Sequence, residues 1–491
     1  MRLVLATPPA DGVMDQVGAP PPLGLLHVAT SVSNSPNVTV HIVDGTVTGL
    51  TVDEAAEQIL ALDPDLLGLS VLSTNIQRGM RLIKRVKELR KSLTTVVGGI
   101  HATLFDRLIL KEIPEVDMAM RGESEHSFPE FCASLMQGQD ITRVPGLSYR
   151  SKGEIVRGTP QLVENLEELP FVDWDTVEKG SYYRSWGPIP LPRDLKAAGI
   201  LSSRGCPYLC SFCSKVAAGE KWRPRSAQNV LEELVQISRQ GFDYVFFHDD
   251  NFTRSPKRVT ELCEMLLEAK LGLRFWFEGS LHHLPQSTLD LMNQAGFDCV
   301  AVGVESGSDE QLKRFNKPGN SRTVASGVLR AKKAHMVVHA FFITGGPGET
   351  TEDHNASKDF IQRVKPHSVG AAILNIYPGS EIWNQLKGLD DPRTVADSGA
   401  CAIYECKDQP SKETLSHRCY DLYRALARSW VSRERIAEVG DLVRNNVFVK
   451  MCLHKGVRRL PNVFRAVWAF VRAPKRGAFD PEQWSSWKRP G

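Results

Sequence analysis

Residues 202–214 read SSRGCPYLCSFCS and place three cysteines, Cys206, Cys210 and Cys213, in the spacing C-x3-C-x2-C. An apolar run over residues 198–203 precedes them and predicts a β-strand. Three thiolates on one loop can bind one metal centre. A structural zinc site uses four ligands, usually as two separated pairs, so three thiolates indicate a centre with an open coordination position. An open position favours chemistry over a structural role.

Two other interpretations of the cysteines remain, namely a zinc knuckle that lacks its fourth ligand and three unrelated buried thiols. The strand before the loop and the motifs after it disfavour both. The chain has ten cysteines in 491 residues, which is too few for a disulfide scaffold. The other seven, including Cys263 and Cys299, lie in apolar helix or strand patterns, so we predict that they are buried.

Strand and helix patterns alternate around and after the cysteines. We predict six parallel strands, at residues 198–203, 244–247, 274–278, 299–304, 339–344 and 368–375, with helices between them. Six βα units predict a partial (β/α)6 barrel. In α/β barrels the catalytic and ligand-binding side chains collect at the C-terminal ends of the strands. We therefore expect functional residues where these strands end.

The strand ends carry acids, glycines and a tyrosine. They read FFHDDNFT, FWFEGS, VGVESGS, ITGGPGET and NIYPGS. Each segment taken singly also suits a solvated loop or a helix cap. Their order along the chain favours one shared site.

The N-terminal region shows the same alternation. Strands are predicted at residues 3–7, 38–43, 66–72, 95–98 and 116–120, each followed by a helical pattern, which is typical of a doubly wound, Rossmann-like or flavodoxin-like domain. The strand ends read VDGTVTG, LSVLSTN, VVGGIHAT and MRGESE. Ligands of such domains bind at the C-terminal ends of the strands. G-x-G-x-x-G is absent after the first strand, which disfavours NAD.

A chain of 491 residues suits two or three domains. We predict a Rossmann-like domain over residues 1–137, a linker with a β-hairpin over 138–195, the partial barrel over 196–385 and a mainly helical region over 386–491. The predicted hairpin spans residues 147–156. The fold class is therefore α/β.

Both halves resemble the cobalamin-binding radical S-adenosylmethionine enzymes, in particular the class B radical SAM methyltransferases. The resemblance is carried by the three-cysteine motif with Phe212 before its last cysteine, and by the strand ends of both domains, and it covers about residues 1 to 400. It implies a 4Fe-4S cluster on Cys206, Cys210 and Cys213, with one iron free to bind S-adenosylmethionine (SAM). It also implies cobalamin in the N-terminal domain.

The resemblance implies contacts with SAM at the barrel's strand ends. These residues are Phe212, Asp249, Asp250, Glu278, Glu305, Ser306, Arg314, Gly345, Gly346 and Tyr377. Asp249, Asp250 and Glu278 correspond to positions near the methionyl amine, Glu305 and Ser306 to the ribose or the amine, and Gly345 and Gly346 to adenine or ribose. Arg314, together with Lys317, is a candidate partner for the carboxylate.

It also implies contacts with cobalamin. These residues are Asp44, Thr46, Gly49, Ser70, Leu72, Gly98, Gly99 and His101. The family's D-x-H-x-x-G loop supplies a histidine to cobalt, whereas this chain has Thr46 at that position. A hydroxyl is a poor cobalt ligand. We therefore predict cobalamin without imidazole coordination, its lower face meeting water or residues 72–76. An empty docking domain and a site for another nucleotide are the alternatives.

The resemblance leaves three functions to distinguish. The first is a methyltransferase that acts on an unactivated carbon of a small-molecule or lipid substrate. The second is a cobalamin-dependent cyclase, ligase or rearrangement enzyme, and the third a sensor that binds both cofactors without turnover. An enzyme of either kind requires a reductant such as flavodoxin or ferredoxin. With 60 Lys and Arg against 57 Asp and Glu, the charge is nearly balanced, so we expect no nucleic-acid partner.

The sequence also predicts where in the cell the protein lies. Its first apolar run is too short for a signal peptide, and no run is long enough to span a bilayer, so we expect a cytoplasmic protein. Residues 457–476, VRRLPNVFRAVWAFVRAPKR, suit a short amphipathic helix with a basic side. This helix either contacts a membrane surface or packs on the barrel.

Overall fold

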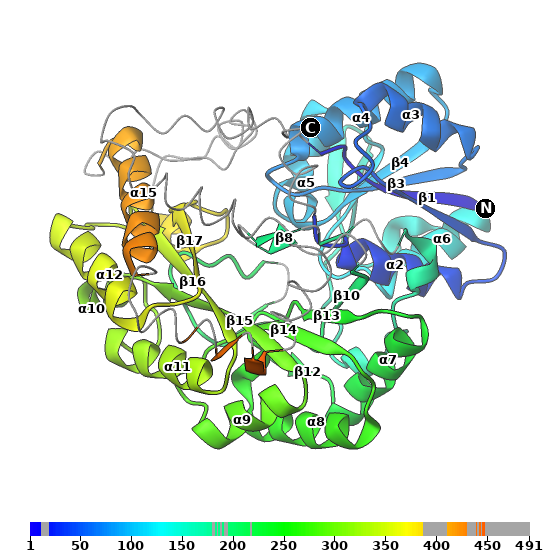
Figure 1. Ribbon diagram of the computed structural model, residues 1–491. Helices are drawn as coiled ribbons and strands as arrows, with labels where there is room; N and C mark the ends of the chain where they lie inside the picture. The colour runs from blue at the N-terminus through cyan, green and yellow to red at the C-terminus, as the bar shows by residue number, and fades with distance from the viewer. Residues whose placement is uncertain are drawn as a thin grey trace, which may run out of the picture.

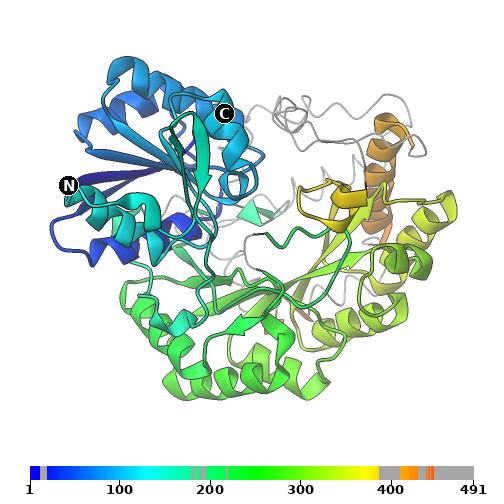
Figure 2. The ribbon, with the colours of Figure 1, turned by 180° about the vertical axis from the view of Figure 1, so that it is seen from behind.

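The computed structural model describes residues 1–10, 19–178, 182–183, 185–186, 189–190, 195–216, 219–385, 410–429, 438, 441–442 and 444–446. Two large sheets dominate it, one of seven strands and one of six. Figures 1 and 2 view them from opposite sides and show the first sheet between helices and the second sheet curved, with helices along its outer side. The α/β class is confirmed.

The first sheet forms the N-terminal domain. Its strands are β1 (Arg2–Thr7), β2 (Thr39–Asp44), β3 (Leu66–Ser70), β4 (Thr94–Gly98), β5 (Met118–Met120), β6 (Leu147–Ser151) and β7 (Glu154–Arg157), in the spatial order β2-β1-β3-β4-β5-β6-β7. The helices are α2 (Leu23–Ser33), α3 (Val52–Ala61), α4 (Ile76–Leu89), α5 (Ile100–Glu112) and α6 (Ser127–Met136). The first five strands are parallel. This is the flavodoxin-like order, whose switch point lies between β1 and β3.

Alternation along the strands places helices on both faces of this sheet. In β1, Val4 and Ala6 pack with α3, α4 and α5, whereas Leu3 and Leu5 pack with α2 and α6. All four side chains are buried. A strand that is covered on both faces has to be apolar at every position, which is why β1 reads as the continuous run LVLA.

The hairpin of β6 and β7 belongs to this sheet rather than to a free linker, because β6 pairs antiparallel with β5. A buried ion pair fixes it: Arg157 donates two hydrogen bonds of 2.8 Å to Asp106 of α5, and Ser148 donates a third of 2.6 Å. The sequence predicted the hairpin but not its partner strand, because strand pairing depends on residues far apart in the chain.

The second sheet forms the partial barrel. Its strands are β10 (Ala197–Ile200), β13 (Tyr244–Phe247), β14 (Arg274–Glu278), β15 (Phe297–Glu305), β16 (Val337–Thr344) and β17 (Ser368–Ile373), all parallel and in chain order. The helices are α7 (Ala227–Arg239), α8 (Pro256–Ala269), α9 (Gln286–Gln294), α10 (Asp309–Arg314), α11 (Ser321–Lys333), α12 (Thr351–Val364) and α13 (Glu381–Gln385). The six predicted strands are confirmed. The first ends earlier than expected, and Ser203–Arg204 forms β11, paired with β12 (Arg223–Pro224).

The barrel has an outer and an inner apolar layer. In β14, Phe275 and Phe277 join the large core beneath the helices, while Trp276 joins a second cluster with Tyr244 and Phe246 of β13. Of the seven cysteines outside the motif, Cys132, Cys263 and Cys299 are buried as predicted, whereas Cys419 is only partly buried. Cys401, Cys406 and Cys452 lie outside the described residues.

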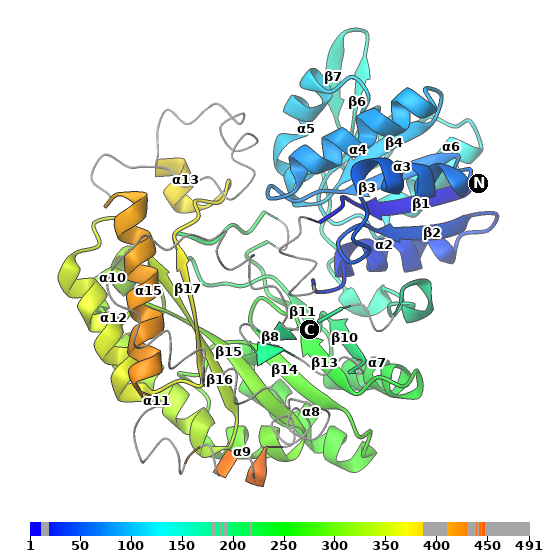
Figure 3. The same ribbon diagram turned by 45° about the horizontal axis from the view of Figure 1, so that its top comes forward.

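The C-terminal region contributes α15 (Lys412–Ser429), which packs on α12 and β17. Figures 1 and 3 show α15 on the β17 side of the barrel and the N-terminal domain on the β10 side. Within the described parts of the chain, no helix is long and apolar enough to cross a membrane. Residues 457–476, where we predicted an amphipathic helix, lie outside the described residues.

Candidate functional site

The three motif cysteines lie on the irregular loop that leaves β11. Cys206 and Cys210 are partly buried and Cys213 is exposed, and none forms a disulfide. Backbone hydrogen bonds hold the loop, because Ser211 donates to Phe315 and Ile382 donates to Ser211, at 2.9 and 3.0 Å. The loop therefore has a defined shape in the protein alone.

The thiols are close enough to influence one another electrostatically. Burial raises the pKa of Cys210 to about 11, while the ammonium of Lys317 opposes this rise and the other two cysteines add to it. Among the described residues, no three His, Cys, Asp or Glu side chains are close enough to hold a single metal ion. A cluster needs wider spacing, because each thiolate binds a different iron. Three free, neighbouring thiols beside a lysine therefore fit a cluster better than a zinc ion.

Phe212 anchors this loop. Its ring meets the edge of Phe315 at a centroid distance of 5.2 Å and packs against Ile376 and Ile382. The side chain thus contacts the turn after α10 and the segment after β17. Tyr377, in that same segment, is 44% exposed.

The acids after β13 and β14 differ in their surroundings. Asp249 is buried and accepts hydrogen bonds from Ser202 and Ser203, with O···O distances of 2.7 and 2.5 Å. Asp249 therefore fixes the start of the cysteine loop, and its predicted contact with SAM stays a prediction. Asp250 is exposed and accepts from the backbone N–H of Gly205 at 2.7 Å. Burial, together with repulsion from the two aspartates, raises the pKa of Glu278 to about 7.

Glu305 lies beside the cysteines. It has a positive φ of 63°, which is unusual for a residue with a side chain, and its carboxylate accepts from Lys317 Nζ at 2.9 Å. A Cβ at Gly303 would collide with the Glu305 carboxylate and lie 2.9 Å from Lys317 Nζ. The lysine is attracted both by Glu305 and by Cys206 and Cys210. Strained backbone of this kind collects at functional sites.

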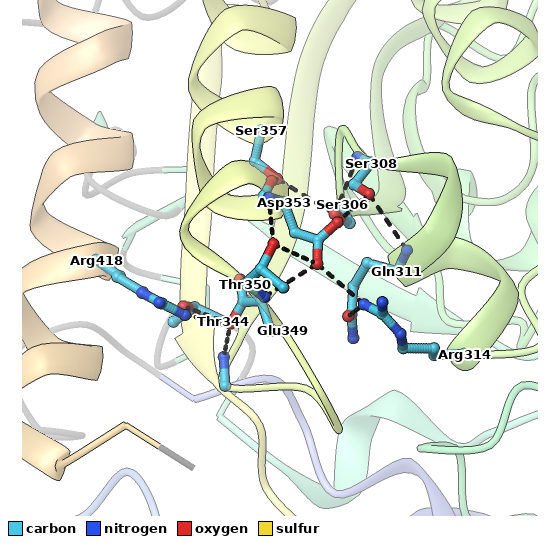
Figure 4. A network of polar contacts seen from close by, with 11 residues as sticks. Ser306, Ser308, Gln311, Arg314, Thr344, Glu349, Thr350, Asp353, Ser357 and Arg418 are labelled. Carbon is cyan, nitrogen blue, oxygen red and sulfur yellow. Dashed lines mark hydrogen bonds and ion pairs between the residues drawn. The ribbon is translucent and has the colours of Figure 1, made fainter. Parts of the chain in front are cut away.

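The first turns of α12 bind the segment that follows β15 (Figure 4). Ser357 accepts from Gly307 N at 2.9 Å, and Asp353 accepts from Ser308 Oγ and, at 2.9 Å, from Arg314 Nη1. Burial opposes the ionisation of Asp353, but hydrogen bonds from Ser308, Thr350 and Arg314 outweigh it and lower its pKa to about 2. This carboxylate therefore stays charged and ties the start of α12 to Ser308, after β15, and to Arg314 of α10.

Two predicted SAM contacts belong to this network. Ser306 is buried, lies 3.3 Å from Ser357 Oγ and accepts from Ser308 N at 3.1 Å. In the structure Ser306 therefore links the segment after β15 to α12, and its predicted contact with SAM stays a prediction. The Arg314 side chain is 37% exposed although Nη1 is occupied by Asp353 and Gln311, so the rest of its guanidinium can still reach a carboxylate.

Gly345 and Gly346 line the loop after β16. A Cβ at Gly346 would lie 2.5 Å from Phe315 Cζ, and one at Gly345, whose φ is 82°, would lie 2.9 Å from Leu415 of α15. A larger residue would have to displace Leu415 or Phe315, so both glycines are buried in a closely packed loop. Glu349 accepts from Gly345 N and, at 3.1 Å, from Arg418 Nη1.

In the N-terminal domain, Asp44 is the centre of a hydrogen-bond cluster at the end of β2. It is buried and accepts from Thr7 and Thr46 hydroxyls, both at 2.6 Å, and from the Tyr182 hydroxyl at 2.8 Å. Thr46 is thus turned back onto Asp44. Gly49 has a φ of 65°, and a Cβ added there would meet no described atom within 4 Å, which is typical of an open turn.

The loops after β3 and β4 form a bare backbone edge. Gly99 has a φ of 90°, and a Cβ there would lie 2.6 Å from Val71 O and 3.2 Å from Ser70 Oγ. A Cβ added at Gly98 would meet only one atom of the described residues within 4 Å, Met120 O at 3.9 Å. Leu72 is 46% exposed at the same edge. A bare backbone with an exposed apolar side chain fits a large cofactor with an apolar face.

His101 lies behind this edge. It is buried, its Nδ1 lies 3.0 Å from Ser73 Oγ, and burial lowers its pKa to about 4. The ring is therefore neutral and positions residues 72–76.

Several residues at these edges escaped the sequence analysis. They are Tyr182, Tyr183, Glu123, Glu125, Glu349, Asp353 and Arg418. Tyr183 is the clearest case: its hydroxyl lies 2.5 Å from His248 Nε2, and its ring stacks on Phe246 at 4.0 Å. It comes from a segment without a motif. Glu123, Glu125 and Glu349 lie in the strand-end segments MRGESE and ITGGPGET, which indicated their position but not their partners. Asp353 also had a signal, the capping box that it forms with Thr350.

The two edges are neighbours in space. A Cβ at Gly379, after β17, would lie 3.3 Å from Ser214 Oγ of the cysteine loop and 3.7 Å from Leu104 of α5. Helix α5 begins directly after Gly99. The cysteine loop and the Gly98–Gly99 edge therefore border the same space between the domains.

Comparison with known proteins agrees with this arrangement. Residues 200–361 match the Radical SAM superfamily, and residues 15–132 match the B12 binding domain. An uncharacterized methyltransferase of Pyrococcus horikoshii is 28% identical over 388 residues, which are 78% of this chain and 82% of the relative. The anaerobic magnesium-protoporphyrin IX monomethyl ester cyclase of Rubrivivax gelatinosus is 26% identical over 374 residues, 74% of this chain and 66% of the relative.

A solved structure shares the fold of almost the whole chain. The cobalamin-dependent SAM radical enzyme OxsB, with aqua-cobalamin and SAM bound, has a TM-score of 0.70 at 17% identity and covers 96% of this chain and 79% of its own. A radical SAM domain uses a 4Fe-4S cluster with SAM, and a B12-binding domain holds cobalamin. With one of each in this order, the chain belongs to the cobalamin-dependent radical SAM enzymes.

Proposed function

We propose that this enzyme is a methyltransferase that acts on an unactivated carbon of a small-molecule or lipid substrate. The observation that carries the proposal is the adjacency of the cysteine loop and the Gly98–Gly99 edge, joined through Gly379 and Leu104. SAM held at one edge and cobalamin at the other would share one space with a substrate. The methyltransferase name of the Pyrococcus relative supports the same reaction.

The proposed roles follow from the contacts. Cys206, Cys210 and Cys213 hold the cluster, with Lys317 balancing their charge, and Glu278, Asp250, Gly345, Gly346 and Tyr377 border SAM. Gly98, Gly99, Ser70 and Leu72 border cobalamin. When bound, the cluster supplies the electron that cleaves the sulfonium bond of SAM, and cobalamin carries the methyl group.

The protein's own part is to position these groups and to keep water out. Close packing of Gly345 and Gly346 fixes the loop after β16, and the charged Asp353 fixes the turn after β15 through Ser308. Burial of Glu278 leaves it near half-protonated at neutral pH, so that a nearby ammonium can draw it into the charged state. Reductant would come from a small electron carrier.

The second candidate is a cyclase or another rearrangement enzyme without net methyl transfer, which the similarity to the Rubrivivax cyclase favours. Methyl-labelled SAM distinguishes the two. The protein would be reconstituted anaerobically with iron, sulfide and hydroxocobalamin and then reduced.

A methyltransferase should release S-adenosylhomocysteine and 5′-deoxyadenosine, with label passing to the cobalamin fraction. Release of 5′-deoxyadenosine without S-adenosylhomocysteine would support the cyclase instead. The Cys210→Ala variant should release no 5′-deoxyadenosine, while Cys263→Ala, whose thiol is buried in the barrel core, should release it as the wild type does.

A further inference from the structure

The segment MRGESE, residues 120–125, follows β5 and carries two acids that no cofactor assignment uses. Both bind arginines of the barrel domain. Glu123 forms two hydrogen bonds of 2.7 Å with Arg223, and Glu125 accepts from Arg204 Nη2 at 2.6 Å. We name Glu123, Glu125, Arg204 and Arg223 the interdomain clamp.

The four side chains of the interdomain clamp are almost completely buried. They are between 2% and 8% exposed. Arg204 also approaches Glu123 at 3.4 Å, so its guanidinium bridges both acids. Arg204 and Arg223 are partners in the β11–β12 ladder, which aligns the two guanidinium groups on one side.

The clamp acts directly on the cysteine loop. Only Gly205 separates Arg204 from Cys206, and Gly205 N donates to Asp250 at 2.7 Å. The backbone that carries the first cysteine is therefore held from two sides, by the N-terminal domain through Arg204 and by the barrel through Asp250.

Stability alone does not explain such a network. Removing four charged groups from water is costly, and apolar residues of similar size would join two domains at least as firmly. Ion pairs with fixed hydrogen-bond geometry instead favour one relative position, because a shift of the domains would leave a buried charge unpaired. Glu125 is especially sensitive, since its Oε2 has no partner among the described residues.

We infer that the interdomain clamp is a positioning device, which holds the cysteine loop at a fixed distance from the N-terminal domain. This inference rests on the proposed placement of the cluster and cobalamin on the two edges. Through that placement the clamp also sets the separation of the two cofactors.

Three variants test the clamp, each with the size of its side chain nearly preserved. Glu125→Gln removes one charge, Glu123→Gln removes the acid that both arginines share, and Arg204→Lys keeps the charge but loses the planar fork that bridges both acids. Asp298→Asn is the matched control, because Asp298 pairs with Arg274 in a buried ion pair within the barrel.

The first measurement needs no cofactor. Hydrogen exchange of the full-length protein should become roughly 10- to 100-fold faster at residues 203–210 in Glu125→Gln and Arg204→Lys, as expected for loss of a buried charged hydrogen bond. Asp298→Asn should leave exchange there unchanged. Unchanged exchange in all three clamp variants would overturn the inference.

The second measurement uses the reconstituted enzyme. Pulsed EPR between the reduced cluster and cob(II)alamin should give a broader distribution of distances in Glu125→Gln than in the wild type or in Asp298→Asn. A distribution as narrow as that of the wild type, with only a lower melting temperature, would reduce the clamp to a structural role. Wild-type protein that binds no cobalamin would count against the proposed function, while the exchange measurement would still decide the clamp.

Discussion

Arg418 of α15 donates a hydrogen bond of 3.1 Å to Glu349, on the same carboxylate oxygen that accepts from the backbone N–H of Gly345 (Figure 4). The Arg418 side chain is 12% exposed and that of Glu349 is 4% exposed. Burial raises the pKa of Glu349, whereas Gly345 and Arg418 oppose this rise. The C-terminal helix therefore supplies a counter-charge to the acid that binds the loop after β16.

We expect Arg418→Gln to weaken SAM binding by roughly 10-fold or more, because it leaves Glu349 buried without its counter-charge. Binding is measured by titrating SAM into the reconstituted protein. Arg428→Gln, at an exposed position of the same helix, is the control and should bind like the wild type. Equal affinity in both variants would show that α15 does not support this loop.

In bound cobalamin, no nitrogen of the protein should coordinate the cobalt as an axial ligand. The Thr46 hydroxyl donates its hydrogen bond to Asp44, and the His101 ring is buried with its Nδ1 beside Ser73 Oγ. EPR spectra of the cob(II)alamin form should therefore lack nitrogen hyperfine splitting, in the wild type as in Thr46→Ala and His101→Ala. Splitting that disappears in His101→Ala would instead identify that histidine as the ligand.

Glu278 should make the cofactor-free protein less stable as pH rises. Its pKa is raised from 4.5 to about 7, so between these values the unfolded chain has lost a proton that the folded protein still binds. The free energy of unfolding should fall across this interval by up to the order of 3 kcal/mol and then level off. Denaturant unfolding between pH 4.5 and 8 measures this loss.

Glu278→Gln should remove that slope, because glutamine does not titrate. Glu268→Gln, at an exposed position of α8, should keep the slope of the wild type. If the free energy of unfolding changed with pH in the same way in the wild type and in Glu278→Gln, the pKa of Glu278 would not be raised.

Gly99→Ala should abolish cobalamin binding and destabilise the N-terminal domain by roughly 1–3 kcal/mol, because it combines an unfavourable φ with a collision against Val71 O. Gly153→Ala is its matched control. Gly153 has a similar φ of 84°, but a Cβ added there would meet no described atom within 4 Å. This variant therefore has the backbone strain without the collision and should retain cobalamin. Cobalamin content after desalting and thermal unfolding distinguish the two.

The sequence predicted most of the architecture because the strands of both sheets are short apolar runs bounded by glycine, proline or acids. Local patterns of this kind also located the cysteine loop and the glycines of the strand ends. The hairpin of β6 and β7 was predicted but was assigned to the linker, since its pairing with β5 depends on Ser148 and Arg157 meeting Asp106.

Side-chain direction decides which of two neighbouring predicted residues is buried in a protein contact. Asp249 and Asp250 are adjacent in the chain, yet backbone alternation turns Asp249 toward Ser202 and Ser203 and leaves Asp250 exposed. Ser306 similarly faces α12 while Glu305 faces Lys317. A motif locates such a pair but does not tell which member meets the ligand.

By itself, the sequence determined the two domains, the cysteine loop with its open coordination position, and the loss of the histidine at Thr46. The domains and the cysteine loop follow from spacing and periodicity, which are local, and the loss of the histidine follows from the resemblance to the family's loop. Only the tertiary structure decided how the two halves are held together, because Arg204 and Glu125 are 79 positions apart and Glu349 and Arg418 are 69 apart. Contacts over such separations depend on how the whole chain packs, and no local pattern encodes them.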